Sequence, residues 1–470
     1  MNRIWDLERF GKSVAIQDEF GGRVAYDVLN SEAHRLAAAV GKRCLVFSLC
    51  RNTPGALLGY AGFLNNGIVP VMLNSHLDET LLGNLLSAYQ PSYLWAPEDL
   101  AGEFDAENVY SAYGYVLLKT NFGKAYPLHE DLALLLTTSG STGSPKFVRQ
   151  SYANILDNAR SIVEYLKLDE TERPITALPM NYTYGLSVIN SHLLVGATIL
   201  VTDKGVMQKE FWNFFREAGA TSFGGVPYTY EMLDRLRFCR RDLPSLRTMT
   251  QAGGKILPEL HEKFAKYAAQ TGKRFYVMYG QCEATARMGY LPAERSLEKT
   301  GSMGIAIPGG IFRLVDGTGR EITVPHTTGE LVYEGKNVTL GYAECGEDLL
   351  KGDERHGILE TGDMAQFDED GFFYIVGRKK RFLKIYGNRV NLDEVDSLIR
   401  SEFRADVACA GVDDHLYLFV TDGKLAAPVR DFIIGKTGLN PAAFNVVVID
   451  AIPRNDAGKT LYEELSRYYA

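Results

Sequence analysis

The stretch TTSGSTGSPK, residues 137–146, is the most informative segment of this 470-residue chain. It follows the apolar run 132–137, which is typical of a buried strand, and Ser151 beyond it is placed to cap a helix. Apolar residues then recur at helical spacing, at Ile155, Leu156, Ala159, Ile162, Val163 and Leu166. The alternation of strand and helix patterns through most of the chain indicates an α/β fold, with this stretch as a loop between a strand and a helix.

The composition of this loop suggests a polyphosphate site. Hydroxyl side chains, glycines and a final lysine bring O–H donors, backbone N–H groups and one cation around a small volume. The alternative is a solvated Ser/Gly loop without a ligand. The common GxxxxGK[ST] nucleotide loop is excluded, because Ser144 and Pro145 separate Gly143 from Lys146.

Composition and charge exclude several classes of protein. The chain has 46% apolar, 11% aromatic and 23% charged residues, which is ordinary for a folded globular protein. Its net charge of -8 argues against binding nucleic acid through diffuse positive potential. Six cysteines without a CxxC pair or metal-ligand spacing favour a reducing cytoplasm over a disulfide or zinc scaffold. No signal-peptide pattern opens the sequence and no apolar run is long and uninterrupted enough to span a membrane, so we expect neither.

The last ninety or so residues form a separate α+β pattern. A basic run, GRKKRFLK at 377–384, follows a DEDG turn at 368–371 and a strand-like segment at 372–376. We therefore predict a boundary at this point, with domains at 1–378 and 379–470. The elements expected after the boundary are a helix at 392–403, strands at 407–412 and 416–421, a helix at 429–436 and a strand at 446–449.

Several further motifs resemble, in order and approximate spacing, the adenylate-forming superfamily of acyl-CoA synthetases, peptide-synthetase adenylation domains and luciferases. Besides the loop at 137–146 they are LPMNYTYGL (178–186), AGGKIL (252–257), YGQCEAT (279–285), GELVYEGKNVTLGY (329–342), ETGD (360–363), GRKKRFLKIYGNRVNLDEVD (377–396) and PRNDAGKT (453–460). The resemblance implies a large N-terminal domain of stacked sheets and helices and a small mobile α+β lid. It also implies two half-reactions: MgATP and a carboxylic acid give an acyl-adenylate, and a thiol then takes the acyl group.

The resemblance also implies roles for individual residues. Lys459 corresponds to the catalytic lysine of the lid, Thr142 to a hydroxyl donor to the phosphates, and Glu283 to the magnesium-binding carboxylate. Asp363 corresponds to the acid that holds the ribose hydroxyls, with Arg378 beside it. The remaining residues implied to bind nucleotide are Thr138, Ser139, Gly140, Ser141, Gly143, Lys146, Gly253, Gly254, Tyr279 (stacked on the purine), Gly280 and Cys282.

Without the motifs around them, these residues have ordinary structural interpretations. Glu283 would be an exposed acid, Lys459 a turn lysine, Asp363 and Arg378 an ion pair at a hairpin end, and Tyr279 a buried tyrosine. Lys380 corresponds to the hinge residue, and Lys384 and Gly387 lie in the basic segment that would face the anionic thiol acceptor. The alternative for that segment is a solvated basic face.

Two departures from the family pattern bear on activity. Cys282 stands where the family usually has threonine, so a weak thiol replaces a hydroxyl donor. Tyr182 stands where many acyl-CoA synthetases have histidine. Thr183 aligns with the aspartate that holds the ammonium of an α-amino acid, so we predict an apolar or aryl acid bound beside Tyr182, Thr183, Tyr184 and the glycines Gly253 and Gly254. These aromatic residues could instead simply pack the core.

The sequence leads to one principal hypothesis and two others. The principal one is an AMP-forming ligase that passes its acid to coenzyme A or to the phosphopantetheine of an acyl or peptidyl carrier protein. The second is a catalytically impaired nucleotide- or acyl-binding protein of the same fold, which Cys282 and Tyr182 motivate. A dinucleotide-dependent enzyme ranks far lower, because no strand ends in GxGxxG. The identity of the acid, the acceptor and the oligomeric state stay open.

Overall fold

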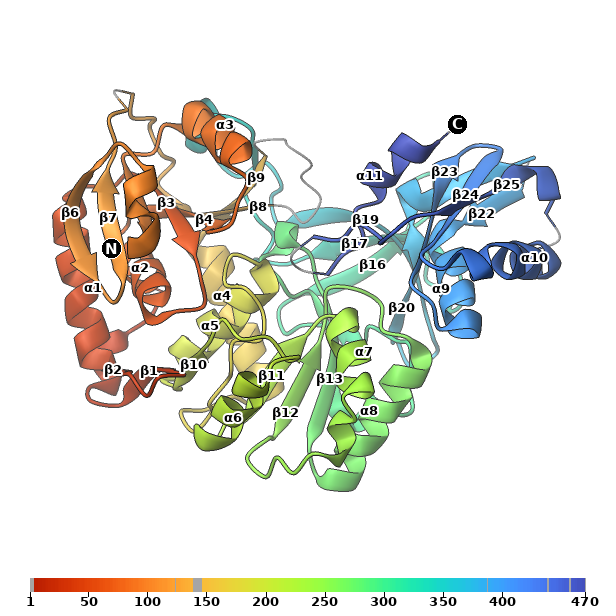
Figure 1. The fold of residues 1–470 in the computed structure, drawn as a ribbon, viewed down its shortest axis with the longest axis horizontal. Coiled ribbons are helices and arrows are strands. Elements are labelled where there is room, and N and C mark those ends of the chain that lie inside the picture. Colours follow the sequence, from red (N-terminus) through yellow and green to blue (C-terminus); the bar gives the residue numbers. More distant parts are fainter. Residues whose placement is uncertain are drawn as a thin grey trace.

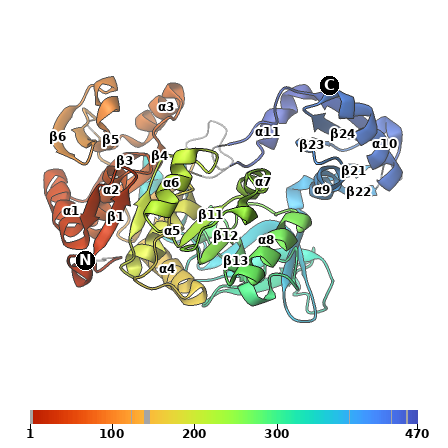
Figure 2. The same cartoon turned by 60° about the horizontal axis from the view of Figure 1, so that its bottom comes forward.

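The computed structural model describes residues 4–469 except 123, 138–145, 387, 438 and 456–457. Figure 1 shows several sheets with helices packed against them, and the C-terminal elements gathered at one end of the molecule. Figure 2, turned by 60°, shows the same separation between the first elements of the chain and the last. The predicted α/β architecture with a C-terminal α+β region is therefore confirmed.

An eight-stranded sheet has the most strands among the described sheets of the N-terminal part. Its strands, in spatial order, are β18 (Gly341–Ala343), β9 (Phe147–Ser151), β8 (Leu132–Thr137), β4 (Val69–Asn74), β3 (Leu45–Cys50), β5 (Tyr93–Pro97), β7 (Tyr115–Lys119) and β6 (Glu107–Ala112). Strands β5, β3, β4 and β8 are parallel to one another, and they read as continuous apolar runs because both faces of the sheet are covered. The helices of this part are α1 (Tyr26–Val40), α2 (Pro54–Asn65) and α3 (Glu79–Tyr89). A small sheet of β10 (Ile199–Val201), β1 (Val14–Asp18) and β2 (Arg23–Ala25) adjoins them.

A five-stranded sheet comes next along the chain, and the candidate site described below lies at one of its edges. Its strands are β11 (Ser222–Gly225), β12 (Thr248–Gln251), β13 (Arg274–Tyr279), β14 (Gly289–Leu291) and β15 (Ile305–Ala306), of which the first three are parallel. The helices of this part are α4 (Tyr152–Leu166), α5 (Thr183–Leu194), α6 (Lys209–Glu217), α7 (Pro227–Arg235) and α8 (Pro258–Thr271). Helix α4 begins as predicted, because the Ser151 hydroxyl accepts the Asn154 N–H at 3.1 Å.

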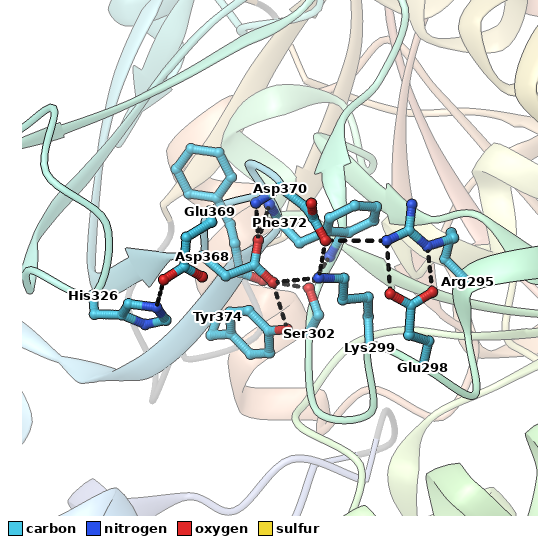
Figure 3. Close-up of polar contacts among 12 residues, drawn as sticks. Arg295, Glu298, Lys299, Ser302, His326, Asp368, Glu369, Asp370, Phe372 and Tyr374 are labelled. Carbon is cyan, nitrogen blue, oxygen red and sulfur yellow. Dashed lines mark hydrogen bonds and ion pairs between the residues drawn. The ribbon is translucent and has the colours of Figure 1, made fainter.

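A four-stranded antiparallel sheet connects this part to the C-terminal region. It consists of β16 (Ile311–Val315), β17 (Gly329–Glu334), β19 (Ile358–Phe367) and β20 (Phe373–Arg378). The turn from β19 to β20 is held by ion pairs shown in Figure 3, in which Lys299 lies 2.9 Å from Asp368 and 2.5 Å from Asp370. Arg295 adds a two-point pair with Glu298 and a contact with Asp370. We call Arg295, Glu298, Lys299, Asp368 and Asp370 the turn cluster.

The C-terminal region has a hydrophobic core of its own. Its elements are β21 (Phe382–Ile385), β22 (Asn388–Asn391), α9 (Leu392–Phe403), β23 (Val407–Val412), β24 (His415–Val420), α10 (Ala426–Thr437), β25 (Phe444–Val448) and α11 (Tyr462–Leu465). Helix α9 and strand β23 have the predicted bounds, whereas β24 and β25 begin one and two residues earlier than predicted and α10 is longer at both ends. The two buried clusters of this region draw only on residues after 382. No helix in the described part of the chain is both long and apolar enough to cross a bilayer.

Candidate active site

The candidate site lies at the carboxyl ends of β11, β12 and β13. Gly225 pairs with Gln251, and Gln251 pairs with Val277, so the segments that leave these three parallel strands lie side by side. This edge of an open α/β sheet is where ligands bind. The motifs AGGKIL and YGQCEAT both start at this edge, which explains why segments distant in sequence meet here.

A small pocket opens at this edge and collects residues from four separate motifs. It is lined by Tyr182, Thr183, Tyr184, Ala252, Gly253, Tyr279, Gly280, Gln281, Cys282, Ala286, Arg287 and Lys459. Eight of the predicted site residues are in this set: Tyr182, Thr183, Tyr184, Gly253, Tyr279, Gly280, Cys282 and Lys459. Lys459 belongs to the C-terminal region, whereas the others come from the N-terminal part.

A turn near the end of the chain presents Lys459 to this pocket. The Asn455 side-chain oxygen accepts the Lys459 N–H at 2.9 Å, and Gly458 has a left-handed backbone with φ +72°. A Cβ atom at Gly458 would come within 3.4 Å of Val226, so the turn lies directly against the N-terminal part. Burial lowers the pKa of Lys459, while the nearby Cys282, Glu283 and Asp363 act in the opposite direction. A partly desolvated ammonium therefore sits among the predicted catalytic groups.

Cys282 remains a neutral thiol in this environment. It is 7% exposed, and burial raises its pKa to about 12. Thr183, at the first position of α5, shares a side-chain hydrogen bond with it. The departure from threonine therefore leaves a protonated group with a hydroxyl neighbour, rather than a reactive thiolate.

Glu283 is oriented by contacts that the sequence did not predict. The Tyr342 hydroxyl donates to Glu283 Oε1 at 2.8 Å, and Thr339 binds the Glu283 carbonyl through its N–H and its hydroxyl, both at 3.0 Å. The ring of Tyr342 also lies under the Lys146 ammonium, 3.9 Å from the ring centroid, and Lys146 pairs with Glu344 at 3.5 Å. Tyr342 thus links the last residue of the Ser/Gly loop to the predicted metal ligand.

One carboxylate ligand is compatible with magnesium. No group of three or more histidine, cysteine or acidic side chains that could enclose a metal occurs among the described residues. Magnesium usually keeps several waters and takes one or two carboxylates together with substrate phosphates. Glu283 fits that pattern, with one carboxylate oxygen held by Tyr342.

Asp363 is the centre of a hydrogen-bond network next to the pocket. It is 5% exposed and accepts the Tyr279 hydroxyl at 2.5 Å and the Gln281 amide at 3.0 Å. Arg378, its ladder partner on β20, lies 3.3 Å away. The Tyr279 hydroxyl is thus engaged by Asp363, and its ring packs edge-on against Phe312 at 6.2 Å. The carboxylate of Asp363 is thus held in place by three side chains of the protein itself.

The glycines permit close packing around the tyrosines. Gly253 has φ +86°, and a Cβ there would lie 2.7 Å from the Tyr182 hydroxyl. Gly254 is not part of the pocket wall and packs on Pro227. Tyr184 shares a 2.7 Å hydrogen bond with Thr250, and burial raises its pKa to about 12. Tyr182 and Tyr184 are both buried and together form a tyrosine wall of the pocket, and both also belong to a buried hydrophobic cluster.

Several predicted residues lie outside what the structure describes. These are Thr138, Ser139, Gly140, Ser141, Thr142 and Gly143 of the Ser/Gly loop, together with Gly387. Lys380 and Lys384 are described in their backbone only, within the segments Lys379–Arg381 and Phe382–Ile385.

The structure adds three residues that the motifs alone did not single out. Gln281 and Tyr342 orient Asp363 and Glu283, and Arg287 brings a buried guanidinium into the pocket wall. Gln281 and Tyr342 lie inside the quoted motifs, so the motifs could have indicated both as site residues. Arg287 lies two residues beyond YGQCEAT, and the only hint in the sequence is a charged residue between apolar neighbours.

Comparisons with known proteins agree with this geometry. Residues 5–343 match the model of the AMP-binding enzyme family. The 2-succinylbenzoate–CoA ligase of Geobacillus kaustophilus is 28% identical over 387 residues, covering 79% of this chain and 77% of that protein. The 4-hydroxybutyrate–CoA ligase 1 of Metallosphaera sedula is 30% identical, covering 72% of this chain and 62% of that protein.

Solved structures show the same fold over the whole chain. The o-succinylbenzoate CoA synthetase of Bacillus subtilis, in complex with its acyl-adenylate intermediate, aligns with a TM-score of 0.79 at 22% identity. The alignment covers 99% of this chain and 97% of that structure. The family model spans well over half of the sequence, and four of the quoted motifs contribute residues to one pocket. This chain belongs to the AMP-binding enzyme family.

Proposed function

We propose that this protein is an AMP-forming acid–thiol ligase whose thiol acceptor is coenzyme A. In the first half-reaction a carboxylate oxygen attacks the α-phosphate of ATP, which forms the acyl-adenylate and releases pyrophosphate. In the second, the CoA thiol attacks the acyl carbon and AMP leaves. One observation carries the proposal: Lys459 of the C-terminal region lines the same pocket as Gly253, Tyr279 and Cys282.

The charges around the pocket suit the first half-reaction. A carboxylate that approaches a triphosphate needs positive charge on both reactants, and positioning and charge neutralisation supply most of the catalysis. Lys459 would contact the attacking carboxylate and the α-phosphate, and Lys146 with residues 138–143 would hold the outer phosphates. Magnesium, when bound, would neutralise phosphate charge, and Glu283 is the carboxylate that would hold it. Asp363 and Arg378 would bind the ribose, whose hydroxyls can donate to the carboxylate.

The second half-reaction requires the C-terminal region to move, and contacts around Lys380 support a hinge there. Lys379 pairs with Glu330 of β17 at 2.7 Å, on the N-terminal side. Arg381 pairs with Asp396 of α9 at 2.8 Å and stacks 3.5 Å over the Tyr462 ring, on the C-terminal side. Lys380 is thus the residue between two oppositely anchored neighbours. Rotation would break contacts that cross the boundary, such as that from the Arg378 N–H to Asp393 at 3.1 Å.

The acceptor and the acid are the finer parts of the proposal. The relatives named above are CoA ligases, which favours CoA over a carrier protein. The tyrosine wall favours an acid with an apolar or aryl body. All six cysteines carry free thiols, so we place the reaction in a reducing compartment, the cytoplasm.

Pyrophosphate exchange with a panel of aryl and aliphatic acids tests the first half-reaction. We expect acid-dependent exchange for at least one class of acid, followed by thioester formation with CoA. A holo carrier protein in place of CoA is the parallel assay for the acceptor. Nucleotide binding without exchange for any acid would contradict the proposal and support the catalytically impaired alternative.

A further inference from the structure

The guanidinium of Arg287 is buried at the pocket among neutral groups. Arg287 is 2% exposed and belongs to the pocket wall. Its Nε donates to the Ser187 hydroxyl at 3.1 Å, and its Nη1 donates to the Tyr165 hydroxyl at 2.9 Å and to the Met278 sulfur at 3.1 Å. Its charge also lies 5.1 Å from the centroid of the Tyr184 ring. The second terminal nitrogen, Nη2, donates to no described residue.

Two other arginines with little-exposed side chains, Arg149 and Arg381, have carboxylate partners. Arg149, which is fully buried, pairs with Glu354 and also donates to backbone carbonyls. Arg381, with a side chain 11% exposed, pairs with Asp393 and Asp396. Within the described part of the chain Arg287 has no ion pair. Burying a charge without a counter-ion is costly, and arginine cannot avoid that cost by losing its proton. The site therefore has one uncompensated positive charge and a free pair of N–H donors.

The backbone holds Arg287 in this position at some cost. The two residues before it, Thr285 and Ala286, have φ values of +50° and +89°, which residues other than glycine rarely adopt. The Ala286 N–H donates to the Gln281 carbonyl at 3.2 Å, and the Thr285 hydroxyl donates to the Asn337 carbonyl at 2.8 Å. Backbone strain of this kind persists where surrounding contacts impose it, often at functional sites. Here it turns the chain from Glu283, the predicted metal ligand, to Arg287 in the pocket wall.

Tyr165 closes the site behind Arg287. Its ring stacks on Tyr290, with centroids 4.2 Å apart and planes at 17°. The same ring forms part of the wall of a separate surface cleft lined by Tyr276, Tyr290 and Pro308, among others. Tyr165 thus stands between that cleft and the guanidinium. An acid that extends from Lys459 to Arg287 therefore has no room to continue past the arginine. The group that contacts Arg287 must be the far end of the acid.

The geometry points to a carboxylate-binding subsite at Arg287, so that the acid activated by this enzyme is a short dicarboxylic acid. One carboxylate would lie beside Lys459 and react, while the other would accept hydrogen bonds from Arg287 Nη2 and complete its charge pairing. The tyrosine wall would contact the body of the acid between them. This inference rests on the proposed function, because it names the substrate class of the same pocket.

Matched pairs of acids test the subsite in the unmodified enzyme. Acyl-adenylate formation would be measured by hydroxamate trapping for diacids and monoacids of equal chain length, such as succinate against butanoate and glutarate against pentanoate. A charge-assisted hydrogen bond predicts that kcat/KM for the best diacid exceeds that for its matched monoacid by roughly ten- to a hundredfold. A preference for the monoacid in every pair would overturn the inference and leave the proposed function intact.

Variants of Arg287 provide the second arm. Arg287→Met should reverse the preference within each pair, and Arg287→Lys should retain part of it, because lysine keeps the charge but not the planar fork. An unchanged diacid-to-monoacid ratio in Arg287→Met would also overturn the inference. If Arg287→Met does not fold, the comparison in the unmodified enzyme still decides.

A binding measurement separates failure of the subsite from failure of the proposed function. Diacids and matched monoacids would be compared for protection of the unmodified protein against thermal unfolding, with a non-hydrolysable ATP analogue present. Protection by diacids alone supports the subsite even if no acid is turned over. Absence of protection by any diacid contradicts the subsite, whereas absence of turnover with every acid contradicts the proposed function.

Discussion

The turn cluster and the pocket differ in whether their positively charged side chains have acidic partners. In the turn cluster each cation forms ion pairs with acidic side chains: Lys299 pairs with Asp368 and Asp370, and Arg295 pairs with Glu298 (Figure 3). In the pocket, Arg287 contacts a hydroxyl, a phenol, a thioether and an aromatic ring, all of them neutral.

This is the difference that we expect between charges that stabilise the fold and charges that would bind a ligand. The turn cluster is electrostatically complete in the protein alone, and its hydrogen bonds fix the hairpin that carries Asp363 and Arg378. The pocket gathers positive charge and neutral phenols, an arrangement that an anionic ligand would complete. Substitutions in the two regions should therefore have opposite profiles, one affecting stability and the other activity.

The largest effect is expected for Lys459→Ala in the pocket. Removal of a preorganised cation from the reacting carboxylate and the α-phosphate should lower the rate of adenylation by about a hundred- to a thousandfold or more. Because burial opposes the charge of Lys459, we expect no loss of thermal stability. Pyrophosphate exchange and a thermal melt measure the two quantities on the same preparation.

A synthetic acyl-adenylate provides the control for this variant. Transfer from the preformed adenylate to CoA does not use the adenylation contacts of Lys459, so the variant should retain much of this step. Equal losses in exchange and in transfer would contradict an adenylation-specific role and indicate a general defect of the pocket.

In the turn cluster, Asp368→Ala should show the reverse profile. Asp368 accepts the N–H groups of Asp370 and Phe372 on one oxygen, and Lys299 and the Tyr374 hydroxyl on the other. Loss of these contacts should lower the midpoint of thermal unfolding by a few degrees, while kcat/KM stays within about twofold.

Glu369 in the same turn is the matched control. Its side chain is 75% exposed and, among the described residues, forms an ion pair only with His326, itself largely exposed, at 2.9 Å (Figure 3). A surface pair of this kind contributes little, so Glu369→Ala should leave the melting midpoint unchanged. Similar shifts for the two variants would mean that the turn cluster has no special role in stability.

More of the pocket than of the turn cluster could be predicted from the sequence, for a physical reason. Local patterns place β8, α4, α9 and β23, because apolar periodicity and a Ser151 cap depend on near neighbours. Eight residues that the motifs single out also line the pocket, since a fixed chemistry requires fixed residue types. Arg287 and the partners of Lys299 depend on contacts between residues 9 to 122 positions apart, which no local pattern encodes. Residues 138–145 of the Ser/Gly loop lie outside the described residues.

The smallest effect concerns pH and a histidine next to the turn cluster. His261 on α8 is fully buried; it accepts the Gly301 N–H on Nδ1 at 3.1 Å and donates from Nε2 to the Ser296 hydroxyl at 3.1 Å. It thus holds the segment that carries Lys299. Burial lowers its pKa to about 4, and His192 in α5 has its pKa lowered to about 4 for the same reason.

The sign of the effect follows from proton binding. An unfolded chain protonates these imidazoles near pH 6.5, whereas the folded protein does so only near pH 4, so stability is complete above about pH 6.5 and declines between those values. Each histidine contributes a slope of at most about 1.4 kcal/mol per pH unit. His261→Gln should therefore lose less stability than the unmodified protein when the pH is lowered from about 7 to 5, as measured by urea midpoints. His415→Gln, at an exposed position of β24, is the control for loss of a histidine. If His261→Gln kept the full pH dependence, acid sensitivity would have to arise from other groups, and the segment at 296–301 would not depend on a neutral imidazole.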